Sequence, residues 1–230
     1  MSDIKIIAFD ADDTLWVNEY HYHKAEHLFA QMMSRFTSPE EARGALLRKE
    51  KENLPLLGYG SKPFIISLVE TAIELSNGSV STDEITQIIE IGKNTIGQKI
   101  ELMPNVVDVL EKLYGRVPLV LATKGDLKEQ ESKIERSGLG RYFSAIKIMS
   151  EKNTKSYQEI LYDHKIEPHQ FLMVGNSFKS DILPVLELGG YAIYIPAEIT
   201  WEHEIVEERE HPNLLKADSL SPDLFTAWTL

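Results

Sequence analysis

The chain has 230 residues, of which 43% are hydrophobic and 26% charged, and these proportions are those of a globular protein rather than a disordered one. Its formal net charge of −12 disfavours nucleic acid or an anionic membrane as a partner, since both attract basic patches. The absence of cysteine excludes disulfides, thiolate catalysis and cysteine-based zinc sites. Because we find no apolar stretch of signal-peptide or membrane-spanning length, we expect a cytoplasmic protein.

The first predicted element is a short strand, and a long helical stretch follows it. Residues 6–9 are apolar on both faces, as in the central strand of a parallel sheet. Ser38-Pro39 and the pair Ser81 and Glu84 are typical of helix starts, the second with capping-box spacing. The periodicity predicts amphipathic helices over 18–36, 39–52, 62–77 and 81–97.

From residue 103 onward, strands and helices alternate. We expect strands at 118–122, 145–149, 171–175 and 192–195, with helices near 104–114, 126–137, 154–164 and 179–188. This alternation predicts an α/β fold with a doubly wound, Rossmann-like parallel sheet. We therefore divide the chain into an α/β core (1–16 and 101–230) and an inserted α-helical cap (17–100), which we expect to cover the carboxyl end of the sheet as a lid.

Polar side chains follow the predicted strands where these strands end. In a parallel sheet the carboxyl ends converge on one edge, so these side chains should meet in space. Burying isolated carboxylates costs several kcal/mol, so such a group should hold a cation or line a solvated cleft. The residues concerned are Asp10, Asp12, Thr123, Lys152, Lys155, Asn176 and Asp181.

These residue types suit phosphoryl transfer. Asp10 is placed to attack phosphorus and form an aspartyl-phosphate, and Asp12 to protonate the leaving oxygen and then activate water. Mg²⁺ held by carboxylate and carbonyl oxygens would screen the repulsion between Asp10 and the phosphate. The Thr123 hydroxyl and a lysine could bind the phosphate oxygens.

Four motifs closely resemble those of the haloacid dehalogenase superfamily of phosphohydrolases. They are DADDTL at 10–15, VLATKGD at 120–126, the lysine within SEKNTKSYQEIL at 150–161, and VGNSFKSDI at 174–182. Their order and their places at strand ends make the resemblance specific, and it covers the whole predicted core. The insert after the first motif resembles the helical, C1-type cap of this family.

The resemblance implies a role for each matched residue. Asp10 would be the nucleophile and a Mg²⁺ ligand, and Asp12 the general acid and base, with its backbone carbonyl on the metal. Thr123 would bind phosphate. Lys152 would steady the phosphate and the nucleophile, and we prefer it to Lys155 because family members often carry a tyrosine five or six residues after this lysine, as Tyr157 follows Lys152.

The metal and substrate sets are completed by resemblance and position. Asp181 would hold the metal directly or through water. Asn176 stands where the family most often has aspartate, so we expect weaker Mg²⁺ affinity but not inactivity. Lys124 is a further substrate-binding candidate. The turn 58–62 reads as a hinge between cap helices or, alternatively, as a specificity loop that carries Tyr59 and Lys62 to the substrate.

We therefore expect a Mg²⁺-dependent phosphomonoester hydrolase acting on a small phosphorylated metabolite. A haloacid-cleaving relative would lack Asp12 and need no metal, and a phosphonate-cleaving relative would use a cap lysine as an amine nucleophile. A non-catalytic binding or regulatory protein is the other alternative, favoured by Asn176 alone. The physiological substrate and the oligomeric state stay open. We read His23 and His27 as structural or solvent-facing residues of the cap, with their role left open, and the acidic stretch 202–210 as a solvated helix face.

Overall fold

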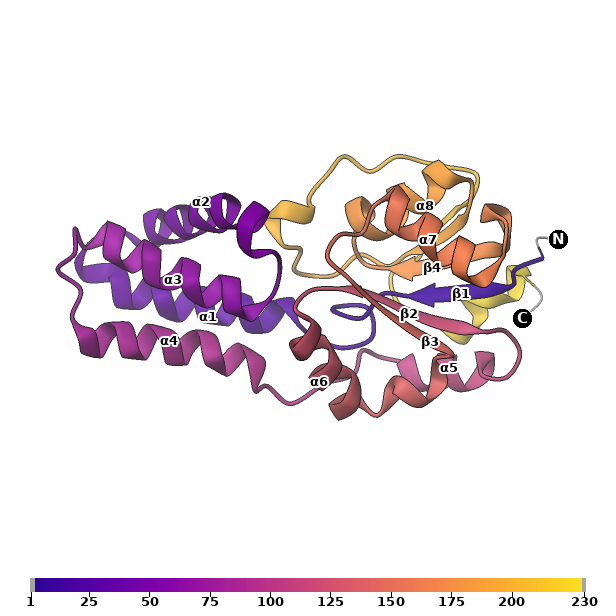
Figure 1. The fold of residues 1–230 in the computed structure, drawn as a ribbon, viewed down its shortest axis with the longest axis horizontal. Coiled ribbons are helices and arrows are strands. Elements are labelled where there is room, and N and C mark those ends of the chain that lie inside the picture. Colours follow the sequence, from indigo (N-terminus) through magenta and orange to yellow (C-terminus); the bar gives the residue numbers. More distant parts are fainter. Residues whose placement is uncertain (1–2, 229–230) are drawn as a thin grey trace. The chain divides into compact units, whose positions relative to one another are not determined.

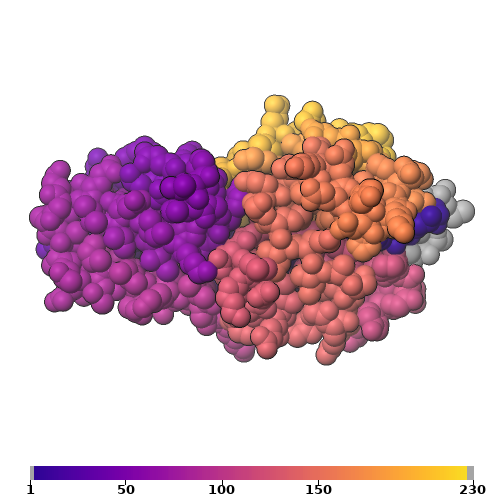
Figure 2. All heavy atoms as spheres, viewed as in Figure 1, coloured from indigo at the N-terminus to yellow at the C-terminus, as the bar shows by residue number. Residues whose placement is uncertain are grey.

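The structure is a computed structural model that describes residues 3–228, and it divides into two compact units (Figure 1). The α/β unit comprises Met1–Glu19, Ile100–Lys124 and Ser132–Leu230. The helical unit comprises Tyr20–Lys99 together with Gly125–Glu131. In the space-filling view, the atoms of residues 20–99 form one closely packed body of their own (Figure 2).

A single parallel sheet organises the α/β unit. Its strand order is β3-β2-β1-β4-β5-β6, so β1 lies in the middle, where Phe9 is in register with Leu121 of β2 and Val174 of β4. This order confirms the predicted α/β fold with a doubly wound parallel sheet. The strands are β1 (Ile6–Phe9), β2 (Leu119–Lys124), β3 (Ala145–Met149), β4 (Phe171–Gly175), β5 (Tyr191–Tyr194) and β6 (Leu214–Lys216).

Helices cover both faces of this sheet because alternate strand residues point to opposite faces. Ile7 of β1 packs in one apolar cluster with Leu110 of α5, whereas Ala8 packs in another with Ile160 of α7. The α-helices of this unit are α5 (Val106–Leu113), α6 (Leu127–Ser137), α7 (Thr154–His164) and α8 (Leu183–Leu188). The short helical segments are η2 (Leu139–Tyr142), η3 (Pro168–Gln170), η4 (Phe178–Ile182), η5 (Glu202–Glu204) and η6 (Pro222–Trp228).

The helical unit is built around its own apolar core. Fully buried side chains from each of its four long helices form this core: Phe29, Leu46, Leu68 and Ile88. Ser38 and Ser81 cap α2 and α4 as predicted, and the Ser81–Glu84 capping box is complete. The helices are α1 (Glu19–Met32), η1 (Met33–Arg35), α2 (Pro39–Leu57), α3 (Ser61–Leu75) and α4 (Thr82–Ile96). Among residues 3–228, no helix has the length and apolar character needed to cross a bilayer.

Several elements differ from the prediction; the predicted helix 179–188, for example, begins as the π-helix η4 before α8. Helix α2 continues to Leu57, because Pro55 lies in the last turn and costs only the hydrogen bond to the carbonyl of Lys51. The acidic stretch 202–210 is not a helix; only η5 is helical, and the remainder has no regular structure. Strand β6 was not predicted, because three residues are too few to show a period-two pattern.

The segment Gly125–Glu131 groups with the helical unit through buried hydrogen bonds to Glu129 and an exposed ion pair at Asp126. The backbone N–H of Ser61 donates to Glu129 Oε2 at 2.9 Å, and its hydroxyl donates to Glu129 Oε1 at 3.0 Å. Lys62 forms an ion pair with Asp126 at 2.8 Å. Helix α6 therefore begins in one unit and ends in the other, a division that the sequence does not reveal. That residues 17–100 form a separate cap domain stays a prediction.

The packing of α3 against α4 gives a stability prediction. A Cβ atom at Gly92 of α4 would lie 2.3 Å from Cγ1 of Ile65 of α3, so in Gly92→Ala either the Ile65 side chain or one of the helices must shift. We expect a loss of about 1–3 kcal/mol in the free energy of unfolding, measured by urea denaturation. Gly44→Ala in α2 is the control: the nearest atom would be 3.7 Å away, so stability should hold or rise. Equal effects of both substitutions would contradict this packing.

Candidate active site

The site begins at Asp10, which directly follows the central strand. Its backbone N–H donates to the carbonyl of Val174 at 2.9 Å, so the turn is fixed to β4. Asp10 is 6% exposed, and Thr14 donates a hydrogen bond to its Oδ2 at 3.0 Å. Burial raises the pKa of Asp10 above its ordinary value, against the opposing effect of the nearby Lys152 charge. Such a carboxylate needs a cationic partner to stay ionised.

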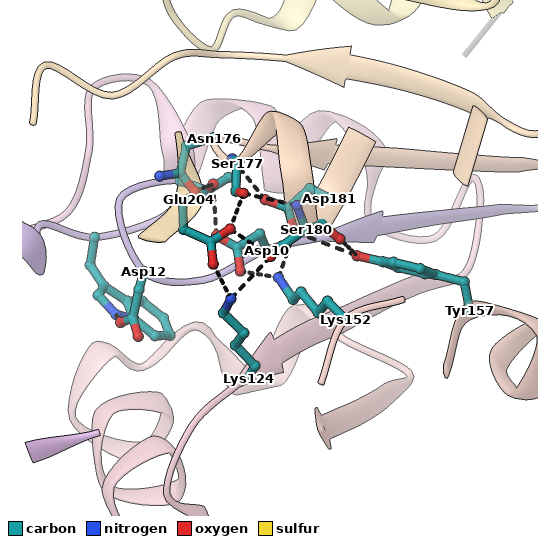
Figure 3. Close-up of polar contacts among 12 residues, drawn as sticks. Asp10, Asp12, Lys124, Lys152, Tyr157, Asn176, Ser177, Ser180, Asp181 and Glu204 are labelled. Atoms are coloured by element: carbon teal, nitrogen blue, oxygen red, sulfur yellow. Dashed lines mark hydrogen bonds and ion pairs between the residues drawn. The ribbon is translucent and has the colours of Figure 1, made fainter. Parts of the chain in front are cut away.

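Lys152 supplies that cation. It lies in the loop between β3 and α7, and its Nζ forms ion pairs with Asp10 Oδ1 and, at 2.6 Å, with Asp181 Oδ1 (Figure 3). Burial disfavours the charged ammonium, but the two carboxylates outweigh this effect and raise the pKa of Lys152. Lys155 is exposed on α7. Of the two candidate lysines, Lys152 is therefore the one that lies beside Asp10.

Asp181 is fixed from several directions. The backbone N–H of Ser177 donates to its Oδ2 at 3.0 Å, and the Tyr157 hydroxyl, which donates to the Ser180 carbonyl at 3.1 Å, lies 3.5 Å from its Oδ1. A Cβ atom at Gly175 would lie 2.4 Å from Cγ of Asp181. Only glycine at the end of β4 therefore allows this carboxylate to approach the strand so closely.

An oxygen-rich cluster lies on the other side of Asp10. One end of the Asn176 amide is 3.0 Å from Asp10 Oδ2 and 3.2 Å from both the Asp12 carbonyl oxygen and Thr14 Oγ1. If the amide nitrogen faces this cluster, it donates hydrogen bonds to all three oxygens. If the amide oxygen faces it, a carboxylate, a carbonyl and an amide oxygen come together, which is the type of ligand set that Mg²⁺ prefers.

The Asp12 side chain turns away from this cluster (Figure 3). Its Oδ1 accepts a hydrogen bond from Nε1 of Trp16 at 2.7 Å, and the ammonium of Lys133 lies 3.1 Å and 3.2 Å from its two oxygens. Lys133, from α6, also donates to Asn18 at 2.7 Å. Lys133 could not be identified from the sequence, because an isolated lysine within a helix carries no motif.

Thr123 lies near the end of β2, the strand next to β1, and is buried. Lys124, the last residue of that strand, directs its ammonium to Ser180 Oγ at 3.0 Å and to the carboxylate of Glu204. Tyr59 and Lys62 belong to the helical unit, where Lys62 pairs with Asp126. A substrate-binding role for Tyr59 and Lys62 stays a prediction.

Glu204 is the residue that sequence analysis most clearly misread. We expected it on a solvated face, but its side chain is 10% exposed and accepts hydrogen bonds from Ser177 and Ser180 besides pairing with Lys124 (Figure 3). Burial alone would raise the pKa of Glu204, but Lys124 and the two serine hydroxyls lower it to about 2. Its acidic neighbours hid this residue, because solvated and buried glutamates look alike in a charged run.

His23 and His27 are exposed on α1, with ring centroids 5.2 Å apart. Over residues 3–228, the structure contains no group of three or more His, Cys, Asp or Glu side chains arranged to hold a metal ion. A metal beside Asp10 would therefore depend on the Asn176 amide and the Asp12 carbonyl as well as on carboxylates.

The fold and these strand-end residues define a class of hydrolase. Residues 4–189 match the family of haloacid dehalogenase-like hydrolases. Because this match covers most of the chain, the protein belongs to that family, which confirms the resemblance seen in the four motifs.

Individual relatives are more distant. Pyrimidine 5′-nucleotidase YjjG of Escherichia coli (strain K12) is 24% identical over 196 residues, which are 80% of this chain and 82% of the relative. A haloacid dehalogenase-like family hydrolase from Xanthomonas campestris, known from its crystal structure, is 35% identical, with a TM-score of 0.88 over 99% of this chain and 91% of that chain.

The fold alone does not decide the bond that is cleaved. The 2-haloacid dehalogenase from Pseudomonas syringae pv. Tomato shares it, with a TM-score of 0.64 and 21% identity over 98% of this chain and 99% of that chain. The choice between phosphate and haloacid chemistry must therefore come from the site residues.

Removing the central ammonium should reveal how strongly the two carboxylates repel each other. Lys152→Met leaves Asp10 and Asp181 buried side by side, so we expect a loss of about 3–5 kcal/mol in the free energy of unfolding near neutral pH. The folded-state pKa of Asp10, already raised by burial, should rise further in this variant. The folded state then binds a proton more readily than the unfolded state, so part of the stability should return as pH falls.

The measurement is urea denaturation at about pH 8 and about pH 5. Lys155→Met is the control, and its stability should follow that of the unmodified protein at both values, because Lys155 is exposed. A Lys152→Met protein that lost no stability, or lost more at the lower pH, would contradict the assigned role of this ammonium.

Proposed function

We propose that this hydrolase cleaves phosphomonoesters through an aspartyl-phosphate on Asp10. The observation that carries the proposal is the pairing of a buried nucleophile, held by Lys152, with a second carboxylate two residues later at Asp12. A haloacid-cleaving enzyme of this family would have no use for that second carboxylate. The carboxylate of Asp12 and the oxygen cluster beside Asp10 both favour phosphoryl transfer.

The two oxygens of Asp10 have different partners. Oδ2 is engaged by Thr14 and belongs to the oxygen cluster, whereas Oδ1 pairs with Lys152. We assign the attack on phosphorus to Oδ1, since Oδ2 lies beside the oxygen atoms proposed to hold the metal. The bond from phosphorus to the ester oxygen breaks as the new bond forms, and Asp12 gives its proton to the departing oxygen. Water then attacks the phosphorus of the aspartyl-phosphate, Asp12 takes a proton from it, and phosphate and Asp10 are released.

The remaining side chains position the phosphate and the proton. Lys152 and the Thr123 hydroxyl offer donors to the phosphate oxygens on which charge accumulates. To reach the leaving oxygen, the Asp12 carboxyl must turn away from Lys133 and Trp16, a rearrangement expected when substrate binds.

A magnesium ion fits the residues beside Asp10. Asp10, the Asp12 carbonyl and the Asn176 amide would hold it, with Asp181 acting directly or through water. When bound, Mg²⁺ would supply the positive charge that neutralises the phosphate and its attacking carboxylate. The substrate would be a small phosphorylated metabolite; the name of the YjjG relative makes pyrimidine 5′-nucleotides the first compounds to test, beside sugar phosphates and phosphoglycolate.

The nucleophile can be tested with Asp10→Asn. The unmodified protein should release phosphate from p-nitrophenyl phosphate and from members of the metabolite panel, and EDTA should stop the release. Asp10→Asn should reduce the rate by at least about 10³-fold, because the amide cannot form the aspartyl-phosphate. Asp108→Asn, an exposed aspartate on α5, should leave the rate unchanged. Halide release from 2-chloropropionate without phosphatase activity would identify a dehalogenase instead.

The metal ligands can be tested with Asn176→Asp. The added carboxylate would face the same cluster, so we expect the dissociation constant for Mg²⁺, measured by calorimetry, to fall about tenfold. Asn94→Asp adds the same charge on an exposed part of α4 and should leave that constant unchanged. Unchanged or weaker binding in Asn176→Asp would remove position 176 from the proposed metal site.

A further inference from the structure

Three hydrogen-bond donors converge on the carboxylate of Glu204 (Figure 3). Lys124 Nζ pairs with Oε1, whereas the Ser177 and Ser180 hydroxyls both donate to Oε2, Ser180 at 2.5 Å. Lys124 itself also donates to Ser180 Oγ at 3.0 Å. Glu204 comes from η5, far along the chain from the four motifs, and the roles proposed above do not use it.

The pair of Lys124 and Glu204 is largely withdrawn from water. The exposed fractions of the two side chains are 16% and 10%, whereas Glu202, two residues earlier in η5, is exposed. When one partner of such a pair is removed, the other is left as an uncompensated charge in a poorly hydrated place. The charge of Lys124 is therefore largely neutralised for as long as Glu204 remains beside it.

The position of this pair gives it a consequence for anion binding. Lys124 directly follows Thr123 at the end of β2, and Ser177 and Ser180 follow the end of β4. These two strands flank β1, which carries Asp10. A lysine ammonium at this edge of the sheet would attract phosphate strongly if its charge were not balanced.

We propose that Glu204 is a positioning residue that neutralises Lys124 and directs its ammonium away from bound phosphate. This inference rests on the proposed phosphatase function and deepens it. The phosphate then meets Lys152 without a second uncompensated ammonium from β2, and the product phosphate leaves more readily. Glu204 thus sets the affinity of the site for phosphate without contacting the reacting atoms.

This role predicts effects of opposite sign for the two partners. Glu204→Gln keeps the size of the side chain but removes the carboxylate that pairs with Lys124, so inorganic phosphate should bind at least about threefold more tightly. Lys124→Met leaves the Glu204 carboxylate unbalanced, so phosphate should bind at least about threefold more weakly. The double variant should bind phosphate nearly as the unmodified protein does, because both charges are gone.

The experiment is calorimetric titration of each protein with inorganic phosphate in one Mg²⁺-containing buffer. Glu202→Gln is the matched control: it removes the same charge from an exposed neighbour and should leave the dissociation constant unchanged. Turnover provides a second readout, in which Glu204→Gln should lower both kcat and the inhibition constant of phosphate. A purely structural role would weaken phosphate binding and would not produce this combination.

Several outcomes would overturn the inference. The inference fails if Glu204→Gln binds phosphate as tightly as the unmodified protein or more weakly. It also fails if no protein in the series binds phosphate. If Glu204→Gln does not fold, Lys124→Met is compared with the double variant. The double variant should bind phosphate more tightly than Lys124→Met does. Equal or weaker binding by the double variant overturns the inference.

The proposed function fails separately from this inference. A protein that releases no phosphate from any ester would refute the phosphatase assignment, whereas the titrations with inorganic phosphate would still test the pairing of Glu204 with Lys124. An active phosphatase in which Glu204→Gln and Glu202→Gln behave alike would retain the function and refute the inference.

Discussion

The ammonium of Lys152, placed between the buried carboxylates of Asp10 and Asp181, is the interaction on which the site depends. Two carboxylates cannot stay ionised side by side in a poorly hydrated place without a cation, and a buried lysine cannot stay charged without anions. Lys152 therefore stabilises the charged forms of both carboxylates, and the two carboxylates stabilise its ammonium. This triad connects the segments that follow β1 and β4 to the loop after β3. The fold brings the three charged groups together, and their attraction in turn holds these segments in place.

The same balance of charges extends outward from the triad. Lys133 holds Asp12 on one side, and Glu204 holds Lys124 on another, so each of these two outer ammonium groups is paired with a carboxylate. A phosphate dianion enters such a place favourably only if it meets positive charge that is positioned beforehand. In the proposed phosphatase, Lys152 and a metal ion supply that charge, and the outer pairs keep the remaining groups from competing for the anion.

Much of this arrangement could be predicted from sequence because it obeys local rules. The alternation of strands and helices fixed the α/β class, and Asp10 was recognisable because a carboxylate directly follows a buried strand. Glu204 and Lys133 could not be predicted in the same way, because their partners are far away in sequence and nothing around them marks burial. Likewise, the choice of Lys152 over Lys155 rested on family resemblance until the structure showed which ammonium is buried.

The most direct test of the central claim is to detect the phosphoryl group on Asp10 itself. The protein would be mixed with p-nitrophenyl phosphate and Mg²⁺, quenched with cold acid during turnover, digested with pepsin at low pH, where an acyl phosphate survives, and analysed by mass spectrometry. The account predicts that the peptide containing Asp10 gains the mass of one phosphoryl group, and that Asp10→Asn shows no such gain. Phosphate release with the phosphoryl group on a residue other than Asp10 would contradict the account. Phosphate release without any phosphorylated peptide, even when turnover is slowed by cold, would also contradict it.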